Sequence, residues 1–138
     1  MVSWEDDSLS PNLIRECHVM TYRAPINDIL LALNHGAGLQ AAVDAGHLGD
    51  YDADIAAAVL EEAGKFASDV LAPLNRVGDQ NGVKLADGKV TTAPGWPDAY
   101  QRWTAAGWNA VAGNEDFGGQ GLPLAINAAC TEIWSAAN

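Results

Sequence analysis

The sequence predicts a mainly α-helical chain with a small β-hairpin excursion around residues 83–91. Two observations lead to this fold class. Apolar residues recur at helical spacing in several segments, and proline or glycine stands where these segments begin and end. The composition agrees, because 49% hydrophobic and 18% charged residues in a chain of 138 are typical of one globular domain with its own core.

The first helix is predicted to begin after Pro25. Residues 1–20 contain Ser, Pro, Asn and Asp without a sustained period, so we expect an irregular extension there and a helical domain over residues 21–138. Four apolar positions between 26 and 33 form the stripe of a short amphipathic helix. The small, glycine-interrupted segment 38–50 is expected to be a loop or a frayed turn.

The longest helix is predicted from Ala53 to about Asn75. Apolar residues recur there at helical spacing, at positions 55, 59, 63, 66, 70, 71 and 74. Asp50 or Asp52 can cap its N-terminus with a side-chain oxygen. Pro73 lacks a backbone N–H group, so we expect it to distort or end the last turn.

A turn sequence, Ala-Asp-Gly over residues 86–88, is flanked by Val83, Leu85 and Val90. This pattern predicts a small hairpin or an extended surface excursion. Because two strands without a third partner are marginally stable, we expect the hairpin to lean on the helices.

Two more helices are predicted in the last third of the chain. The first has Pro97 in its first turn, carries Tyr100 and Trp103 on one face, and stops at Gly107. The second covers residues 122–138 and has no closing glycine or polar tail. We therefore expect the chain to be cut within this last helix.

The loop between these helices, residues 114–123 with the sequence NEDFGGQGLP, contains three glycines in four residues. Such a loop can cradle a phosphate with backbone N–H groups or form a tight corner between two helices. A phosphate-binding loop needs a lysine after its last glycine or a preceding strand, whereas Gly121 is followed by Leu122 and the loop follows a helix. The tight corner, with Pro123 starting the next helix, is the favoured interpretation.

Charge and the length of apolar runs argue against several classes of function. The chain carries 18 acidic residues and 7 Lys plus Arg, a net charge of −11, which argues against binding to a nucleic-acid backbone. No run approaches the roughly 18 apolar residues of a membrane span. Residues 1–20 have neither an apolar signal region nor the character of a transit peptide, so we expect a cytoplasmic protein.

The cysteines and histidines show no ligand spacing. Cys17 and Cys130 lie far apart and outside any CxxC pair, and histidines 18, 35 and 47 form no HExxH motif. We therefore expect no metal site. Cys130 lies in an apolar stretch and is predicted to be a buried, inert thiol.

Three motifs in order resemble the acyl-CoA dehydrogenase family, and together they cover residues 20–138. The pair GW followed by EDFGGQGLP resembles the signature GW and P-E-x-(Y/F)-G-G-x-G-L, with Asn114 where the family often has proline. The opening MTYRAPINDILLAL and the ending TEIWSAAN resemble a long bacterial subgroup that includes methylmercaptopropionyl-CoA dehydrogenase-like enzymes. The residues that carry the loop motif are Gly107, Trp108, Phe117, Gly118, Gly119, Gly121 and Pro123.

The resemblance implies an up-and-down, N-terminal helical domain of a three-domain flavoprotein oxidoreductase of fatty acid metabolism. The full-length parent would oxidise an acyl-CoA thioester to the trans-2-enoyl-CoA, pass electrons from FADH2 to an electron-transfer flavoprotein, and form a homo-oligomer. In the family the catalytic glutamate and most of the FAD site belong to other domains. The resemblance therefore implies no catalytic residue here, no cofactor bound by the isolated chain, and no activity of the fragment alone.

Trp134 and Asn138 are the candidate pocket residues, because in the family the helix around this point helps to line the acyl pocket. Core packing is the favoured role for Trp134. For Glu115, Asp116 and Glu132 a structural or surface role is favoured over that of a general base. The alternative to an enzyme domain is a free-standing helical module that binds a partner protein through an exposed apolar face.

Overall fold

The structure is a computed structural model that describes residues 22–48 and 52–138. Over these residues it consists of helices and a two-stranded antiparallel sheet, which confirms the predicted fold class. The predicted extension over residues 1–20 lies outside the described residues. The elements in chain order are α1 (Ile26–Leu31), η1 (Ala32–Gly36), α2 (Leu39–Asp44), α3 (Ala53–Phe66), η2 (Ala67–Leu71), α4 (Ala72–Asn81), β1 (Lys84–Ala86), β2 (Lys89–Thr91), α5 (Trp96–Ala105), η3 (Trp108–Ala110), η4 (Glu115–Phe117) and α6 (Leu124–Ala137).

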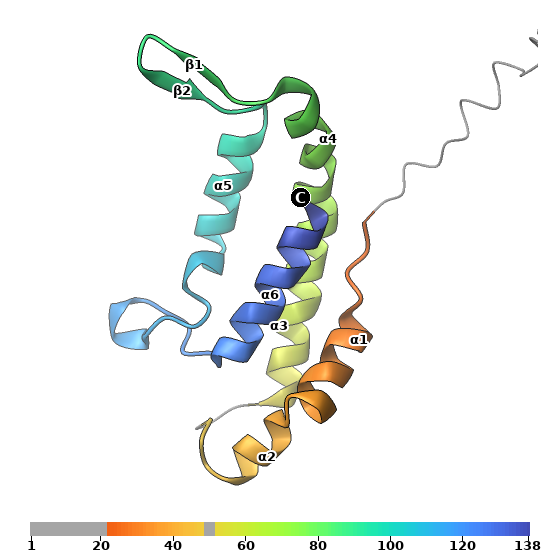
Figure 1. Cartoon of the computed structure of the whole chain (residues 1–138). Helices are drawn as coiled ribbons and strands as arrows, with labels where there is room; N and C mark the ends of the chain where they lie inside the picture. The colour runs from red at the N-terminus through yellow and green to blue at the C-terminus, as the bar shows by residue number, and fades with distance from the viewer. Residues whose placement is uncertain (1–21, 49–51) are drawn as a thin grey trace, which may run out of the picture.

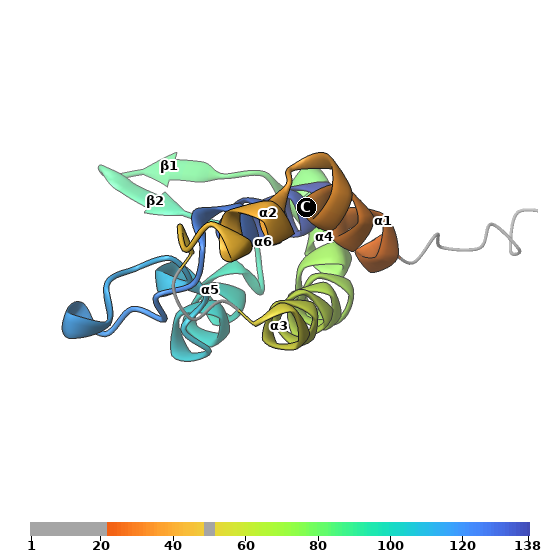
Figure 2. The same cartoon turned by 90° about the horizontal axis from the view of Figure 1, so that it is seen from below.

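The long helices run up and down (Figure 1). The continuous run of α3, η2 and α4 rises along one side, α5 returns in the opposite direction, and α6 runs beside α3 in the direction of α3. Seen from below, α1 and α5 lie on opposite sides of this pair (Figure 2). None of the described helices combines the length and the hydropathy that a bilayer crossing requires.

The predicted long helix is confirmed and continues past its predicted end, to Asn81. Asp52 caps its start, because its Oδ1 accepts the backbone N–H groups of Asp54 at 2.7 Å and Ile55 at 3.2 Å. Pro73 is the second residue of α4, two residues after the end of the π-type turn η2. A proline ring clashes with the carbonyl four residues before it, and a wider turn relieves the clash, so Pro73 distorts the helix without ending it.

The core lies where α3 and η2 pack against α6. Small side chains on both partners allow a close approach of the two helices. Ile55, one of the predicted apolar positions, is 54% exposed, because the stripe that faces α6 begins one residue later. The buried residues of this contact are Ala56, Leu60, Ala63, Ala67, Ile126, Ala129, Cys130 and Ile133.

The prediction of a loop over residues 38–50 is wrong in part, because Leu39–Asp44 form the helix α2. Gly38 has a φ of +66° and turns the chain into this helix, while Leu39 is buried in the core. A helix of six residues has little stability of its own. Burial of Leu39 supplies the tertiary support that the local sequence does not reveal.

The predicted hairpin is confirmed, with Leu85 of β1 opposite Val90 of β2. The prediction that it leans on the helices is wrong. Val83, Leu85 and Val90 are 69%, 73% and 65% exposed. The strands project beyond the ends of α4 and α5 (Figure 1), and every residue of the two strands is exposed.

Candidate functional site

An aromatic groove lies where α5, the end of α6 and the junction of η2 with α4 meet. Its volume is about 330 Å³, at the lower end of the range of small-molecule sites. Trp134 and Asn138, the two candidate pocket residues of the sequence, both line it. The complete lining, which defines the aromatic groove, is Leu71, Leu74, Trp96, Ala99, Tyr100, Trp103, Trp134, Ser135 and Asn138.

Two glycines allow α5 to approach α4 at the groove. A Cβ atom on Gly95 would lie 2.8 Å from Cδ2 of Leu74, and a Cβ atom on Gly78 would lie 3.2 Å from the ring of Trp96. Contacts of this length leave no room for larger residues without movement of the neighbours. Trp96 was not among the predicted site residues, although Trp96, Tyr100 and Trp103 recur at the spacing of one helical face.

Aromatic contacts join α5 to α6 across the groove. The rings of Tyr100 and Trp103 stack with centroids 6.1 Å apart, and Trp103 meets Trp134 edge to face at 5.5 Å. Trp108 meets the same Trp134 ring at 5.4 Å. Edge-to-face pairs of this geometry stabilise packing beyond the area they bury. Trp134 is therefore both a core residue and a wall of the groove.

The indole Nε1 of Trp134 is buried and has no hydrogen-bond partner among the described residues. A buried indole N–H usually finds an acceptor. The two edge-to-face neighbours, Trp103 and Trp108, provide π faces, which are weak acceptors. A stronger acceptor would have to come from outside the described residues.

Asn138 links α6 to η2 at the groove. Its Nδ2 donates to the carbonyl of Leu71 at 3.1 Å, and its backbone N–H donates to the carbonyl of Trp134 at 3.1 Å. The bond from Nδ2 orients the side chain. The side-chain carbonyl oxygen takes part in neither bond, so it can accept a hydrogen bond from a ligand.

The chemistry of the groove is that of apolar binding. Its lining contains aromatic and aliphatic side chains, a hydroxyl on Ser135 and on Tyr100, and the amide of Asn138, but no carboxylate, histidine or lysine. Such a surface can hold an apolar chain and orient a few polar atoms. It supplies no general base, so proton abstraction would require a group from elsewhere.

The three carboxylates that were weighed as general bases, those of Glu115, Asp116 and Glu132, lie outside the groove. Glu132 is exposed and lines a separate hollow between α1 and α6, and Oε1 of Glu115 lies against Gly121. Asp116 is exposed in the loop. Among the residues that the structure describes, no group of His, Cys, Asp and Glu is arranged to hold a metal ion.

Burial shifts the pKa of two groups near the core. It raises the pKa of the Cys130 thiol from 9.0 to about 11, because the thiolate loses its hydration in the contact between α3 and α6. Burial, with a smaller contribution from Glu132, also raises the pKa of Tyr22, whose hydroxyl donates to the Ile133 carbonyl at 2.9 Å. Neither group lines the aromatic groove, so both are structural.

The glycine-rich loop is a closed corner. A Cβ atom on Gly119 would lie 2.1 Å from the carbonyl carbon of Gly113, and Gly118 and Gly121 have φ values of +82° and +65°. The backbone N–H groups of residues 117–122 all donate to backbone carbonyls within residues 110–115. Gln120 Nε2 donates to the Gly107 carbonyl at 2.9 Å and ties the loop to the residues that follow α5.

This loop does not fit the pyrophosphate of FAD. A phosphate cradle needs backbone N–H groups directed at the ligand, whereas the N–H groups of residues 117–122 are engaged within the loop. The aromatic groove has no basic side chain to take that role. Neither place in the described chain therefore holds the phosphates of a flavin by itself.

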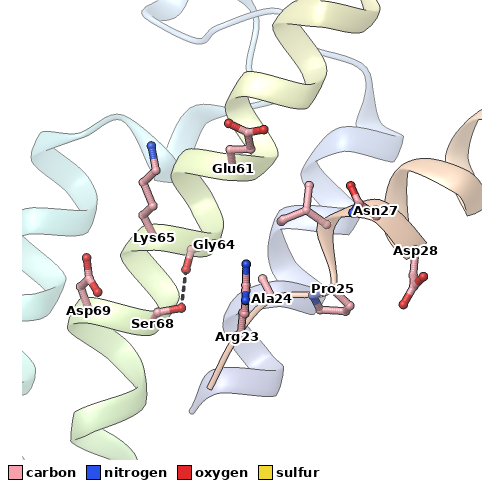
Figure 3. A pocket seen from close by; sticks show the side chains of 11 residues that line it. Arg23, Ala24, Pro25, Asn27, Asp28, Glu61, Gly64, Lys65, Ser68 and Asp69 are labelled. Atoms are coloured by element: carbon pink, nitrogen blue, oxygen red, sulfur yellow. Dashed lines mark hydrogen bonds between the residues drawn. The ribbon is translucent and has the colours of Figure 1, made fainter. Parts of the chain in front are cut away.

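A larger hollow of about 680 Å³ lies between residues 23–28 and the helix α3–η2 (Figure 3). Its charged side chains have both signs, because its lining includes Arg23 and Lys65 as well as Asp28, Glu61 and Asp69. Within it the Ser68 hydroxyl donates to the Gly64 carbonyl at 2.9 Å, a bond inside the helix. Because charges of both signs line it, this hollow favours no single class of ligand as clearly as the aromatic groove does.

Comparison with known proteins gives one curated relative. Over 119 residues, 86% of the chain, the sequence is 35% identical to a 3-methylmercaptopropionyl-CoA dehydrogenase of Ruegeria pomeroyi. The chain is related to the acyl-CoA dehydrogenases. It spans about a fifth of the length of that relative, 20%. No family model matches the chain.

This similarity to the relative confirms the family that the sequence resembles. The resemblance was carried by three motifs, which lie around Gly107, in residues 20–33 and in the last helix. It gives no support to the alternative of a free-standing interaction module. The substitution of Asn114 for the usual proline is accommodated in the loop, because its side chain accepts the N–H of Asp116 at 2.7 Å and begins the turn η4.

Proposed function

We propose that the chain is the N-terminal helical domain of a flavin-dependent acyl-CoA dehydrogenase and that the aromatic groove forms one wall of its acyl pocket. The observation that carries the proposal is that Trp134 and Asn138 meet in one apolar groove, in a chain related to such an enzyme over 86% of its length. The boundary of this domain is taken as residues 21–138, as the sequence predicts.

The proposed reaction of the full-length protein is the oxidation of an acyl-CoA thioester to the trans-2-enoyl-CoA. An acyl chain is apolar and would pack against Trp96, Trp103 and Leu74. Ser135 and Asn138 offer polar atoms for the thioester end of the ligand. The catalytic base, FAD and the contact with an electron-transfer flavoprotein belong, in this proposal, to the parts of the protein outside the described residues.

The name of the curated relative points to a short acyl chain. The relative is named for 3-methylmercaptopropionyl-CoA, a thioester of a short acid. We therefore propose short-chain acyl-CoA thioesters as the first substrate class to test. The cytoplasmic location and the homo-oligomer of the full-length protein stay predictions from the sequence.

The test is a dehydrogenase assay of the full-length protein that contains this chain. A series of acyl-CoA thioesters of increasing chain length, with 3-methylmercaptopropionyl-CoA among them, is offered with an artificial electron acceptor. We expect enoyl-CoA formation by the full-length protein, with a preference for short chains, and no turnover by the 138-residue chain alone. Absence of turnover with every thioester by a flavin-loaded full-length protein would contradict the proposal.

A further inference from the structure

The β-hairpin has one apolar face and one basic face. Leu85 and Val90 are directly paired, so their side chains point to the same side of the sheet, and Val83 continues the same alternation two residues before Leu85. Lys84 and Lys89 occupy the alternate positions and lie on the other face. The register therefore collects the aliphatic side chains of the hairpin on one side.

This apolar face has no partner among the described residues. Its three side chains are 65–73% exposed, and every residue of β1 and β2 is exposed. A two-stranded hairpin is marginal in water unless a third layer covers its apolar face. The hairpin projects away from the helices (Figure 1), so the helices of this chain do not supply that layer.

We infer that another domain of the same polypeptide covers the apolar hairpin face, which Val83, Leu85 and Val90 define. The inference rests on the proposed function, because it requires the chain to be one domain of a longer enzyme. The relative is about five times as long as the match, since the chain spans 20% of it. A tethered domain meets the hairpin at a high effective concentration, so even a small contact is occupied.

A second copy of the chain is the less suitable occupant. Stable interfaces between separate proteins bury roughly 800 Å² on each partner. Three aliphatic side chains form a patch well below that size. Within one polypeptide no such area is required. The covalent link already restricts the relative translation of the two domains, so less translational entropy is lost when they meet than when separate molecules bind.

The covering surface is expected to be apolar. The apolar hairpin face presents aliphatic side chains, whereas Lys84 and Lys89 lie on the opposite face of the two strands. A domain that covers the apolar face therefore leaves the two lysines on the solvent side, and Lys84 is the matched position outside the contact.

Photo-crosslinking in the full-length protein tests the inference. A photoreactive phenylalanine analogue replaces Leu85, and a matched variant carries it at Lys84 on the other face of the same strand. We expect the first variant to crosslink to a residue beyond 138 in the same polypeptide, with the mass of a monomer on a denaturing gel, and the second to crosslink far less. A dimer-mass product, a crosslink confined to residues 22–138, or equal yields from both positions overturns the inference.

Hydrogen exchange of the unsubstituted protein gives a second measurement that needs no variant. The amides of residues 84–91 are expected to exchange at least about tenfold more slowly in the full-length protein than in the 138-residue chain. Equal rates overturn the inference, as does a reading frame that ends at Asn138. The thioester assay above decides the proposed function separately, because a crosslink to a later domain can form in a protein that has no dehydrogenase activity.

Discussion

Gly119 stands where the glycine-rich loop closes on itself. A Cβ atom there would lie 2.1 Å from the carbonyl carbon and oxygen of Gly113, which real side chains do not tolerate. Its neighbour Gly118 has no atom within 4 Å of the position of a Cβ atom, but its φ is +82°. The two glycines thus serve different purposes, close backbone approach at Gly119 and a left-handed conformation at Gly118.

Replacing these two glycines by alanine separates the two requirements. We expect Gly118→Ala to lower the free energy of unfolding by roughly 1–2 kcal/mol, the cost of a left-handed conformation for a residue with a Cβ atom. Gly119→Ala is expected to cost at least about 3 kcal/mol, because the backbone of Gly113 must move. Urea denaturation followed by tryptophan fluorescence measures both. Equal losses for the two variants would contradict the close approach at Gly119.

The buried thiol of Cys130 makes a prediction about reactivity and pH. Its pKa is raised to about 11, so the folded chain disfavours the thiolate and stability is lost as the pH rises above 9.0, the ordinary value. In a Cys17→Ser background we expect Cys130 to react with a thiol reagent at pH 8 about 100-fold more slowly in the folded chain than in urea. The loss of stability between pH 9 and pH 11 should be smaller in Cys17→Ser/Cys130→Ala. Rapid labelling of the folded chain would show that the thiol is accessible.

Among the helices, α3 begins with a side-chain cap. Asp52 Oδ1 accepts two backbone N–H groups, whereas Asp54 lies in the first turn and caps none. Asp52→Ala is expected to lower the free energy of unfolding by about 1 kcal/mol. Asp54→Ala, the matched control, loses only the favourable charge near the helix N-terminus and should cost about half as much. A larger loss for Asp54→Ala would mean that the cap is not formed in solution.

The helices that could be predicted from the sequence are those whose signals are local. The period over residues 53–75 and the prolines at 97 and 123 predict three helices. The first begins where predicted and extends past its predicted end, and the other two lie close to their predicted bounds. Leu39 could not be assigned to a helix, because its burial in the core, a non-local contact, helps to stabilise α2. The continuation past Pro73 also depends on a non-local feature, the contact of α4 with Trp96 through Gly78.

At the scale of the whole molecule, the candidate site is assembled by packing between elements that are distant in sequence. The sequence indicates Trp134 and Asn138 through the resemblance of the last helix, and the structure brings both to one groove. Leu71, Leu74 and Trp96 could not be assigned to it, since their proximity follows from how α4 and α5 meet. The hairpin was also expected to pack against the nearest helices. Its aliphatic side chains are exposed to solvent instead, so this expectation is wrong.

The central claim is that the aromatic groove is a wall of the acyl pocket, and kinetics of the full-length protein with Trp134→Ala test it most directly. We expect kcat/KM for the preferred acyl-CoA to fall by about 10–100-fold, as the loss of a large aromatic contact predicts. Ile55→Ala, at a residue 54% exposed on α3 and outside the groove, is the control and should leave kcat/KM unchanged. If Trp134→Ala folds, binds flavin and keeps the kcat/KM of the unsubstituted protein, the groove is not part of the acyl pocket.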